Sequence, residues 1–209
     1  MQLSTLFERC LSVPYIHLEN DADFAAERLG CTLHLYFECS NGATDWKNNL
    51  DFPAKPYRHM DGSLWFAHGG FLKVWKSAEP HIATLLRDRC IRRVVIVGYS
   101  HGGALGVFCH EYVWFHRPDL RRRLVGYGFG CPRVVWGLPS PGLRKRWEGF
   151  TVVRNTNDLV THLPPAVMGY THVGKMLTIG QPGLYSSMDA HRPENILREL
   201  RRFEGAVPP

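Results

Sequence analysis

The sequence predicts an α/β fold, a three-layer sandwich with a mostly parallel central sheet and helices on both of its faces. Two observations lead to this prediction. Short β-branched or aromatic runs alternate along the chain with segments of helical periodicity, and the run Val94–Val97 is continuously apolar, as in a strand buried on both faces of a sheet. The 209 residues suffice for one well-cored domain and are few for two, so we expect a single domain over residues 1–209.

The expected elements follow in chain order. A helix is expected over about 21–29 from an Asn-Asp cap, then a strand at 32–37, a polar segment at 38–51, and a loop at 52–63 that holds two prolines. A strand at 63–67 leads into a helix over about 71–89, and a helix that ends before Pro118 follows the β-branched strand. Later strands are expected at 124–129, 150–153 and 175–179. The last helix is amphipathic, with one apolar face formed by Ile196, Leu197, Leu200 and Phe203.

Composition and targeting signals restrict the class of protein. Hydrophobic residues make up 44% of the chain and charged residues 21%, which is ordinary for a soluble globular protein. No apolar run approaches the roughly 20 residues needed to span a bilayer. The N-terminal stretch lacks the basic and long apolar regions of a secretory signal, so we expect a cytoplasmic protein, or a secreted one if a leader has been removed. The 6 cysteines form no C-x-x-C pair, which argues against a zinc site and favours reduced thiols.

The net charge of +6 does not indicate a nucleic-acid-binding protein. Much of it comes from arginine clusters at expected helix ends or on the last helix, where cations complement the helix dipole and stay solvated. No basic motif with interleaved aromatic residues suggests nucleic-acid recognition. We therefore expect no nucleic-acid partner and at most transient contact with a membrane or lipid surface.

One serine has the sequence context of a nucleophile. Gly98-Tyr99-Ser100-His101-Gly102 has the spacing G-x-S-x-G, directly after the β-branched strand and directly before a helix. Side chains at the two glycines would collide with the neighbouring strand and helix as the turn tightens, and the turn lifts the hydroxyl clear of the sheet. The alternative is an ordinary glycine-rich turn in which Ser100 only caps the helix.

A nucleophilic serine needs a neutral imidazole to accept its proton and an acid to orient that imidazole. Asp158 directly follows the expected strand at 150–153, whereas Asp119 lies in an arginine-rich turn and Asp189 is too close to the expected histidine. His191 lies in a loop just before the last helix, and His172 is its competitor. The remaining histidines after Ser100 lie inside the following helix or too close to Asp158: His110, His116 and His162.

Several separated blocks resemble the class 3 lipases, a family of α/β-hydrolases. Leu35-Tyr36-Phe37-Glu38-Cys39-Ser40 with Asp45-Trp46 resembles the family's F-R-G-S/T…D-W, and His68-Gly69-Gly70-Phe71 resembles its H-x-G-F. The serine block, Gly98-Tyr99-Ser100-His101-Gly102-Gly103-Ala104-Leu105, resembles G-H-S-L-G-G-A-L. Gly128-Phe129-Gly130-Cys131-Pro132-Arg133-Val134 resembles F-G-x-P-R-V, and Asp158-Leu159-Val160-Thr161-His162-Leu163-Pro164-Pro165 resembles D-I/L-V-P-x-L-P-P. In order and spacing the resemblance covers about residues 30–200.

The resemblance implies a role for each matching residue and an α/β-hydrolase fold. Ser100 matches the nucleophile and Asp158 the triad acid, while His172 matches a histidine outside the triad, which leaves His191 as the general base. The oxyanion hole is expected to use the backbone N–H of His101 and Ser40, which matches the family's other donor. No metal or organic cofactor is expected.

Three departures from the family pattern change the expectations. Glu38-Cys39 replaces the R-G pair before Ser40, and His101 replaces a leucine. A histidine there is expected at the rim of the pocket, solvated rather than bound to a substrate carbonyl. The segment that matches the family's lid, residues 40–50, is polar, with only Ala43, Trp46 and Leu50 able to face a lipid interface. We therefore expect weak interfacial activation and a preference for short-chain or soluble esters.

Together these observations predict a serine ester hydrolase that acts on a small-molecule or lipid ester, either a lipase or a carboxylesterase. A phospholipase A1 or an acyltransferase would use the same three residues. A hydrolase fold kept only as a non-catalytic binding module is the alternative from another class.

Overall fold

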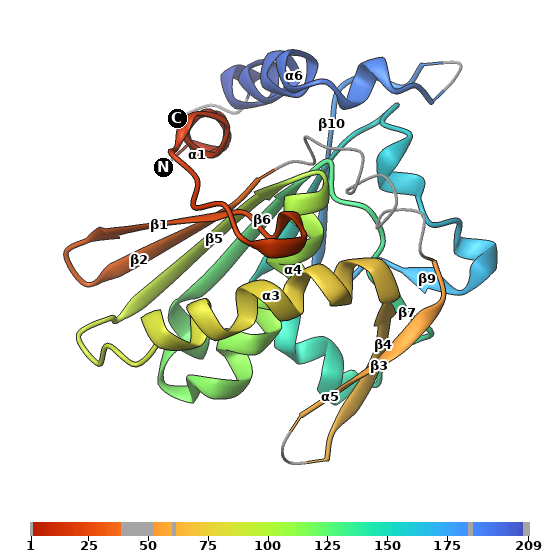
Figure 1. Cartoon of the computed structure of the whole chain (residues 1–209). Coiled ribbons are helices and arrows are strands. Elements are labelled where there is room, and N and C mark those ends of the chain that lie inside the picture. The colour runs from red at the N-terminus through yellow and green to blue at the C-terminus, as the bar shows by residue number, and fades with distance from the viewer. Residues whose placement is uncertain (1, 39–51, 60–61, 184–185, 207–209) are drawn as a thin grey trace.

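The computed structural model describes residues 2–38, 52–59, 62–183 and 186–206. Its larger sheet has the strand order β1-β2-β5-β6-β8-β10 (Figure 1). The first strand, β1 (Phe24–Leu29), pairs antiparallel to β2 (Thr32–Phe37). From β2 onward the neighbours are parallel: β5 (Arg93–Tyr99), β6 (Leu124–Phe129), β8 (Phe150–Asn155) and β10 (Lys175–Ile179). The carboxyl ends of these parallel strands therefore meet at one edge of the sheet.

Helices cover both faces of this sheet. On one face α1 (Leu3–Ser12) and α6 (Pro193–Ala206) lie side by side, and on the other face lie α3 (Gly69–Leu85) and α4 (His101–His116) (Figure 1). Alternate residues of β5 pack into different clusters, since Val94 and Ile96 join the α3–α4 side while Val95 and Val97 join the α1–α6 side. The strand is thus buried on both faces, as its β-branched run predicts. None of the described helices is long and apolar enough to cross a membrane.

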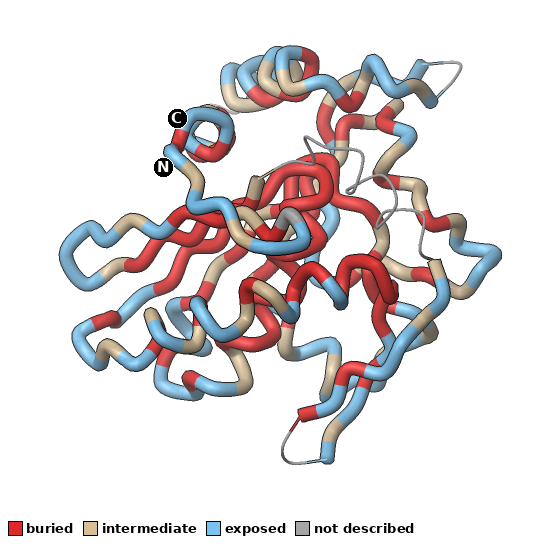
Figure 2. The backbone as a smooth tube through the Cα atoms, viewed as in Figure 1, coloured by how far each residue is buried: buried red, intermediate tan, exposed pale blue. Residues whose placement is uncertain are grey.

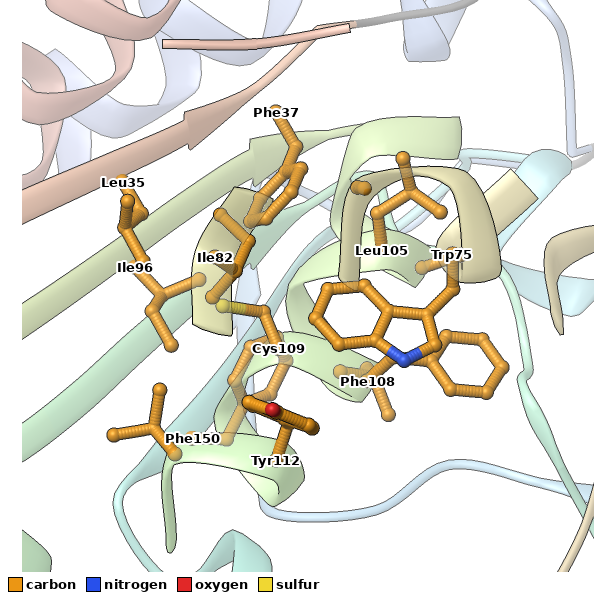
Figure 3. Packing of buried hydrophobic residues seen from close by; sticks show 14 of the residues in the cluster. Leu35, Phe37, Trp75, Ile82, Ile96, Leu105, Phe108, Cys109, Tyr112 and Phe150 are labelled. Atoms are coloured by element: carbon orange, nitrogen blue, oxygen red, sulfur yellow. The ribbon is translucent and has the colours of Figure 1, made fainter. Parts of the chain in front are cut away.

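The larger of the two buried clusters lies between the sheet and the α3–α4 layer. Trp75 of α3 contacts Phe37 of β2, with ring centroids 6.5 Å apart, and stacks on Phe108 of α4 at 6.1 Å (Figure 3). Helix α4 is buried continuously from His101 to Val113, and the tube in Figure 2 shows buried residues along the middle of the sheet and this helix. The helix that follows Ser100 is therefore packed on all sides from His101 to Val113.

A smaller antiparallel sheet packs at the side of the larger one, in the strand order β3-β4-β7-β9. Its strands are β3 (Ala54–Arg58), β4 (Leu64–His68), β7 (Val135–Trp136) and β9 (Tyr170–Thr171). Tyr57 and Trp65 from this sheet belong to the same buried cluster as Val94 and Ile96 of β5. The remaining described helices are short: η1 (Glu19–Asp21), η2 (Pro118–Arg123), α5 (Pro141–Arg144), η3 (Lys145–Trp147), η4 (Val160–His162), η5 (Ala166–Met168) and η6 (Asp189–His191).

The structure corrects two expected elements. The helix expected over 21–29 is wrong: residues 24–29 form β1, which turns through Gly30-Cys31 and pairs with β2 from Leu29↔Thr32 onward. The loop expected over 52–63 is also wrong in part, because 54–58 form β3. Pro56 lies in this strand at the edge of the sheet, where a missing N–H donor breaks no ladder inside the sheet. The strands expected at 32–37, 124–129 and 175–179 are confirmed with their bounds.

The helix expected over 71–89 lies at 69–85 instead. It begins earlier because the His68 side chain accepts a hydrogen bond from the Phe71 backbone N–H at 3.3 Å and so caps the first turn. The cysteines within the described ranges are free thiols, and of these Cys10, Cys109 and Cys131 are buried while Cys31 and Cys90 are exposed.

Candidate active site

Ser100 lies in a tight turn between β5 and α4. Its backbone has φ 54° and ψ −118°, a left-handed conformation that is strained for any residue with a Cβ. A Cβ on Gly98 would overlap the backbone of Gly102, and a Cβ on Gly102 would overlap the carbonyl of Phe37 in β2. The turn is held by the Ser100 N–H, which donates to the Phe129 carbonyl at the end of β6 at 2.8 Å. The close approach predicted for both glycines is therefore present.

The structure brings Ser100, His191 and Asp158 into one hydrogen-bonded chain. Ser100 Oγ lies 2.8 Å from His191 Nε2, and His191 Nδ1 lies 2.8 Å from Asp158 Oδ2. Asp158 is fully buried, and Ser100 and His191 are 9% and 7% exposed. An ionised carboxylate can only accept, so Nδ1 carries the ring proton and Nε2 presents its lone pair to the serine hydroxyl. The arrangement can therefore draw a proton from Ser100 onto an oriented imidazole.

Each of these residues follows the carboxyl end of a strand of the larger sheet. Ser100 follows β5, Asp158 comes three residues after β8, and His191 lies in η6 beyond β10. The second carboxylate oxygen of Asp158, Oδ1, accepts a hydrogen bond from the Val160 N–H at 2.9 Å, and the Asp158 carbonyl accepts one from Thr161 Oγ1 at 2.8 Å. Both oxygens of the carboxylate are thus partnered, which fixes the side chain in its buried position.

Gly130 is part of this site although the sequence assigns it no role. It has φ +56°, and a Cβ there would lie 2.8 Å from His191 Cε1 and 3.0 Å from Asp158 Oδ2. Its N–H donates to the Val153 carbonyl of β8 at 2.9 Å, so the backbone passes directly beside the imidazole–carboxylate pair. The only sequence signal was its place in the F-G-x-P-R-V block, directly after a strand.

His172, the competing histidine, is engaged elsewhere. Its Nε2 donates to the Thr161 carbonyl at 2.8 Å, and burial lowers its pKa to about 4. It therefore connects the stretch after β9 to the segment that follows Asp158. The structure places His191, and not His172, against Ser100.

Only one of the two expected oxyanion residues lies within the part of the chain that the structure describes. Ser40 lies outside the described residues, as does the whole segment 40–50. His101 is the first residue of α4, directly after Ser100, but the expectation that its side chain is solvated at a rim is wrong: it is 2% exposed. Its ring packs edge-on against Phe71 of α3 at 5.3 Å, and burial lowers its pKa to about 4, so the imidazole is neutral at pH 7.

A group of side chains that could bind a metal ion lies outside the Ser100–His191–Asp158 chain. Within the described ranges, His17, Asp23 and Glu38 have ligand atoms within 4.8 Å of one another. His17 Nδ1 and Asp23 Oδ2 are already hydrogen-bonded at 2.7 Å. The Ser100–His191–Asp158 chain shares no residue with this group.

Comparison with known proteins identifies the family. The family model for lipase (class 3) matches residues 34–168, which include Ser100 and Asp158. A lipase of Rhizomucor miehei is 28% identical over 151 residues, which cover 69% of this chain and 40% of that protein. A lipase of Rhizopus niveus is 25% identical over 150 residues, which cover 68% of this chain and 37% of that protein. The chain thus spans about two fifths of the length of these curated relatives.

Solved structures agree on the fold. The lipase of Rhizopus microsporus var. chinensis has a TM-score of 0.66 at 20% identity and is matched over 85% of this chain and 68% of its own. The propeptide complex of Rhizomucor miehei lipase has a TM-score of 0.62 at 22% identity, over 89% of this chain and 67% of its own. At such identities the likeness establishes the α/β-hydrolase fold alone. With the family model covering well over half of its residues, the chain belongs to the class 3 lipase family.

Proposed function

We propose that this protein is a serine hydrolase of carboxylic esters, a lipase or carboxylesterase. The observation that carries the proposal is the hydrogen-bonded chain from Ser100 Oγ through His191 to the buried Asp158. Ser100 is the nucleophile, His191 the general base and Asp158 the group that orients it. One structural neighbour, with a TM-score of 0.64 at 24% identity, is described as a triacylglycerol lipase whose catalytic centre is a serine protease triad.

The reaction proceeds in two symmetrical halves. Ser100 Oγ attacks the acyl carbonyl carbon while its proton passes to His191 Nε2, and a tetrahedral oxyanion forms. The oxyanion collapses, the bond to the alcohol oxygen breaks, and His191 returns its proton to the leaving alcohol. Water then attacks the acyl-serine ester, gives its proton to His191, and the carboxylic acid leaves as the proton returns to Ser100 Oγ. Asp158 stays ionised and stabilises the imidazolium in each half.

The oxyanion needs donors where the negative charge develops, each worth on the order of 3 kcal/mol in the transition state. We propose the backbone N–H of His101 as one donor, since it opens α4 beside Ser100 and the positive end of the helix dipole lies there. Ser40 is proposed as the second donor from its family position.

The neutral, buried His101 ring places no full charge beside the oxyanion. We propose that the two donors and the helix dipole therefore supply the stabilisation.

The substrate is proposed to be a short-chain or soluble acyl ester, because residues 40–50 offer few apolar side chains to a lipid surface. Hydrolysis rates of a short triglyceride just below and just above its solubility limit test this. Similar rates on both sides are expected, and a jump of tenfold or more would refute the preference. A relative from Malassezia globosa, 28% identical over 115 residues, is named a secreted mono- and diacylglycerol lipase, which makes partial glycerides the first substrates to assay.

Two other activities would use the same three side chains, and their products distinguish them from a lipase or carboxylesterase. A phospholipase A1 would release a fatty acid from a diacyl phospholipid, and an acyltransferase would form a new ester when an alcohol is added. A non-catalytic binding module is disfavoured because the hydrogen bonds of the site are intact.

The decisive experiment is covalent labelling with a fluorophosphonate, which reacts with an activated serine. Labelling is expected in the native protein and in Ser12→Ala, an exposed serine on α1. It should be lost in Ser100→Ala and strongly slowed in His191→Ala. Labelling that persists in Ser100→Ala would overturn the proposal.

Domain organisation and location remain predictions. We propose one domain over residues 1–209, supported by the buried cluster that joins the smaller sheet to β5. Limited proteolysis of the intact chain should then leave no separately stable half. A cytoplasmic location is the prediction from the sequence, and secretion is the alternative that the name of the Malassezia relative supports. Fractionation of the native cells decides between them.

A further inference from the structure

Two side chains outside the proposed triad hold the turn that carries His191. Tyr99 Oη donates a hydrogen bond to the His191 backbone carbonyl at 2.6 Å. Asn155 Nδ2 donates to the preceding carbonyl, that of Ala190, at 2.9 Å. Tyr99 is 5% exposed and Asn155 6% exposed; the Tyr99 bond is buried, and the Asn155 bond is partly buried because Ala190 is half-exposed. Two consecutive carbonyls of η6 are thereby fixed by side chains from elsewhere in the chain.

The two donors come from the strands that carry the other members of the site. Tyr99 is the last residue of β5 and directly precedes Ser100, while Asn155 is the last residue of β8, three residues before Asp158. The Tyr99 ring also lies over the His191 imidazole, with the ring centroids 5.2 Å apart and the planes inclined by 29°. Phe7 of α1 supports Tyr99 from another side with an edge-on contact at 5.3 Å. Hydrogen bonds from the ends of both β5 and β8 therefore fix the position of His191.

The reaction cycle shows when these bonds matter most. In the free enzyme the imidazole has two side-chain partners, Ser100 Oγ and Asp158 Oδ2. Once Ser100 is acylated, its Oγ is an ester oxygen and has no proton to donate to Nε2. The imidazole then keeps only Asp158 as a side-chain partner, at the stage when it must accept a proton from water. A ring misplaced by about 1 Å can cost about 100-fold in rate.

We propose that Tyr99 and Asn155 are positioning residues that keep His191 aligned in the acyl-enzyme, so that they act mainly on deacylation. This inference rests on the proposed function. It assigns a role to the Tyr99 hydroxyl, which occupies the position of the histidine in the family's G-H-S-L-G-G block.

The first test is Tyr99→Phe, which removes the hydroxyl and keeps the ring over His191. With a p-nitrophenyl ester we expect kcat to fall about tenfold and kcat/KM, which reports acylation, to change less than threefold. A burst of p-nitrophenol should precede the slower steady state. Asn155→Asp, which turns the donor into an acceptor facing the Ala190 carbonyl, should change kcat and kcat/KM in the same way.

A matched control is Tyr127→Phe. Tyr127 lies in β6, opposite Val97 of β5, and packs against the same buried cluster as Tyr99. The identical change there should leave kcat and kcat/KM within twofold of the native values. If Tyr99→Phe behaves like Tyr127→Phe, or if its kcat and kcat/KM fall equally without a burst, the inference is wrong.

A second readout needs no catalysis and separates this inference from the proposed function. The proton on His191 Nδ1, shared with Asp158, should give a low-field NMR signal that is sharp in the native protein and in Tyr127→Phe. In Tyr99→Phe that signal should broaden or disappear. An unchanged signal would overturn the inference, whereas a native protein that hydrolyses no ester would overturn the proposed function.

Discussion

Gly130→Ala is the sharpest structural test of the site because it adds one methyl group against the imidazole–carboxylate pair. The new Cβ would lie 2.8 Å from His191 Cε1, 2.9 Å from His191 Nδ1 and 3.0 Å from Asp158 Oδ2. Non-bonded carbon atoms prefer separations of about 3.5–4.0 Å. The imidazole must therefore move by about 0.7 Å, and it can do so only by disturbing its 2.8 Å hydrogen bonds to Ser100 and Asp158.

The expected loss follows from that displacement. A shift near 1 Å in a reacting group costs about 100-fold in rate, so kcat/KM should fall by about two orders of magnitude. The left-handed backbone at φ +56° adds a separate cost of about 1–2 kcal/mol to the folded state for any residue with a Cβ. That is a minor part of the roughly 5–15 kcal/mol of a typical domain, so the variant should fold with a lower melting temperature.

Gly30→Ala separates the two effects. Gly30 has φ +59°, nearly the same conformation, and an added Cβ there meets nothing within 4 Å. We expect Gly30→Ala to lower the melting temperature to a similar extent and to keep full activity. Ester hydrolysis and thermal unfolding of both variants are the measurements. The reasoning is refuted if Gly130→Ala keeps kcat/KM within threefold of the native value, or if Gly30→Ala loses as much activity.

Two further predictions follow from the same structure. Asp158→Asn keeps the shape of the side chain but favours the wrong imidazole tautomer, so kcat should fall about four orders of magnitude; a loss under tenfold would contradict its role. Burial lowers the pKa of His101 to about 4 and that of His110 to about 3, while both titrate near 6.5 in the unfolded chain. As the pH falls below 6.5, these histidines become protonated in the unfolded chain but stay neutral in the native state. The free energy of unfolding should therefore be lower at pH 5 than at pH 7 by about 2 kcal/mol per histidine. Urea unfolding at the two pH values measures this, and His110→Gln should reduce the difference by about 2 kcal/mol.

The parts of the fold that could be predicted from the sequence are those whose pattern reflects burial on both faces or a tight backbone approach. The run Val94–Val97 and the glycines around Ser100 specify a strand and a turn without reference to the rest of the chain. The segment Phe24–Leu29 lacked such a signal, because its place beside β2 depends on the turn at Gly30-Cys31 and its first residues are buried only by the assembled sheet. A local pattern could not distinguish this edge strand from a helix.

The residues of the site likewise divide into those with a local sequence signal and those whose place depends on the assembled fold. Ser100 and Asp158 follow strands that the sequence predicts, so their meeting at one edge of the sheet could be expected. His191 could be preferred to His172 only through the family resemblance, and the structure adds the physical reason. The ring nitrogen of His172 donates to the Thr161 carbonyl, whereas that of His191 faces Ser100. His101 was misplaced because the sequence shows a polar residue beside the nucleophile but not the Phe71 ring against which it packs.

The site depends on glycines as much as on its reactive side chains. At Gly98, Gly102 and Gly130 a single methyl group would occupy space that the strand ends, the start of α4 or the His191–Asp158 pair already fill. Such a constraint allows one residue type only, so it leaves a recognisable mark in a sequence. The donors to the η6 carbonyls are under a looser constraint, since a carbonyl accepts from any N–H or O–H that reaches it. This difference explains why a motif search finds the turn around Ser100 and passes over Tyr99 and Asn155, although all of them determine where His191 lies.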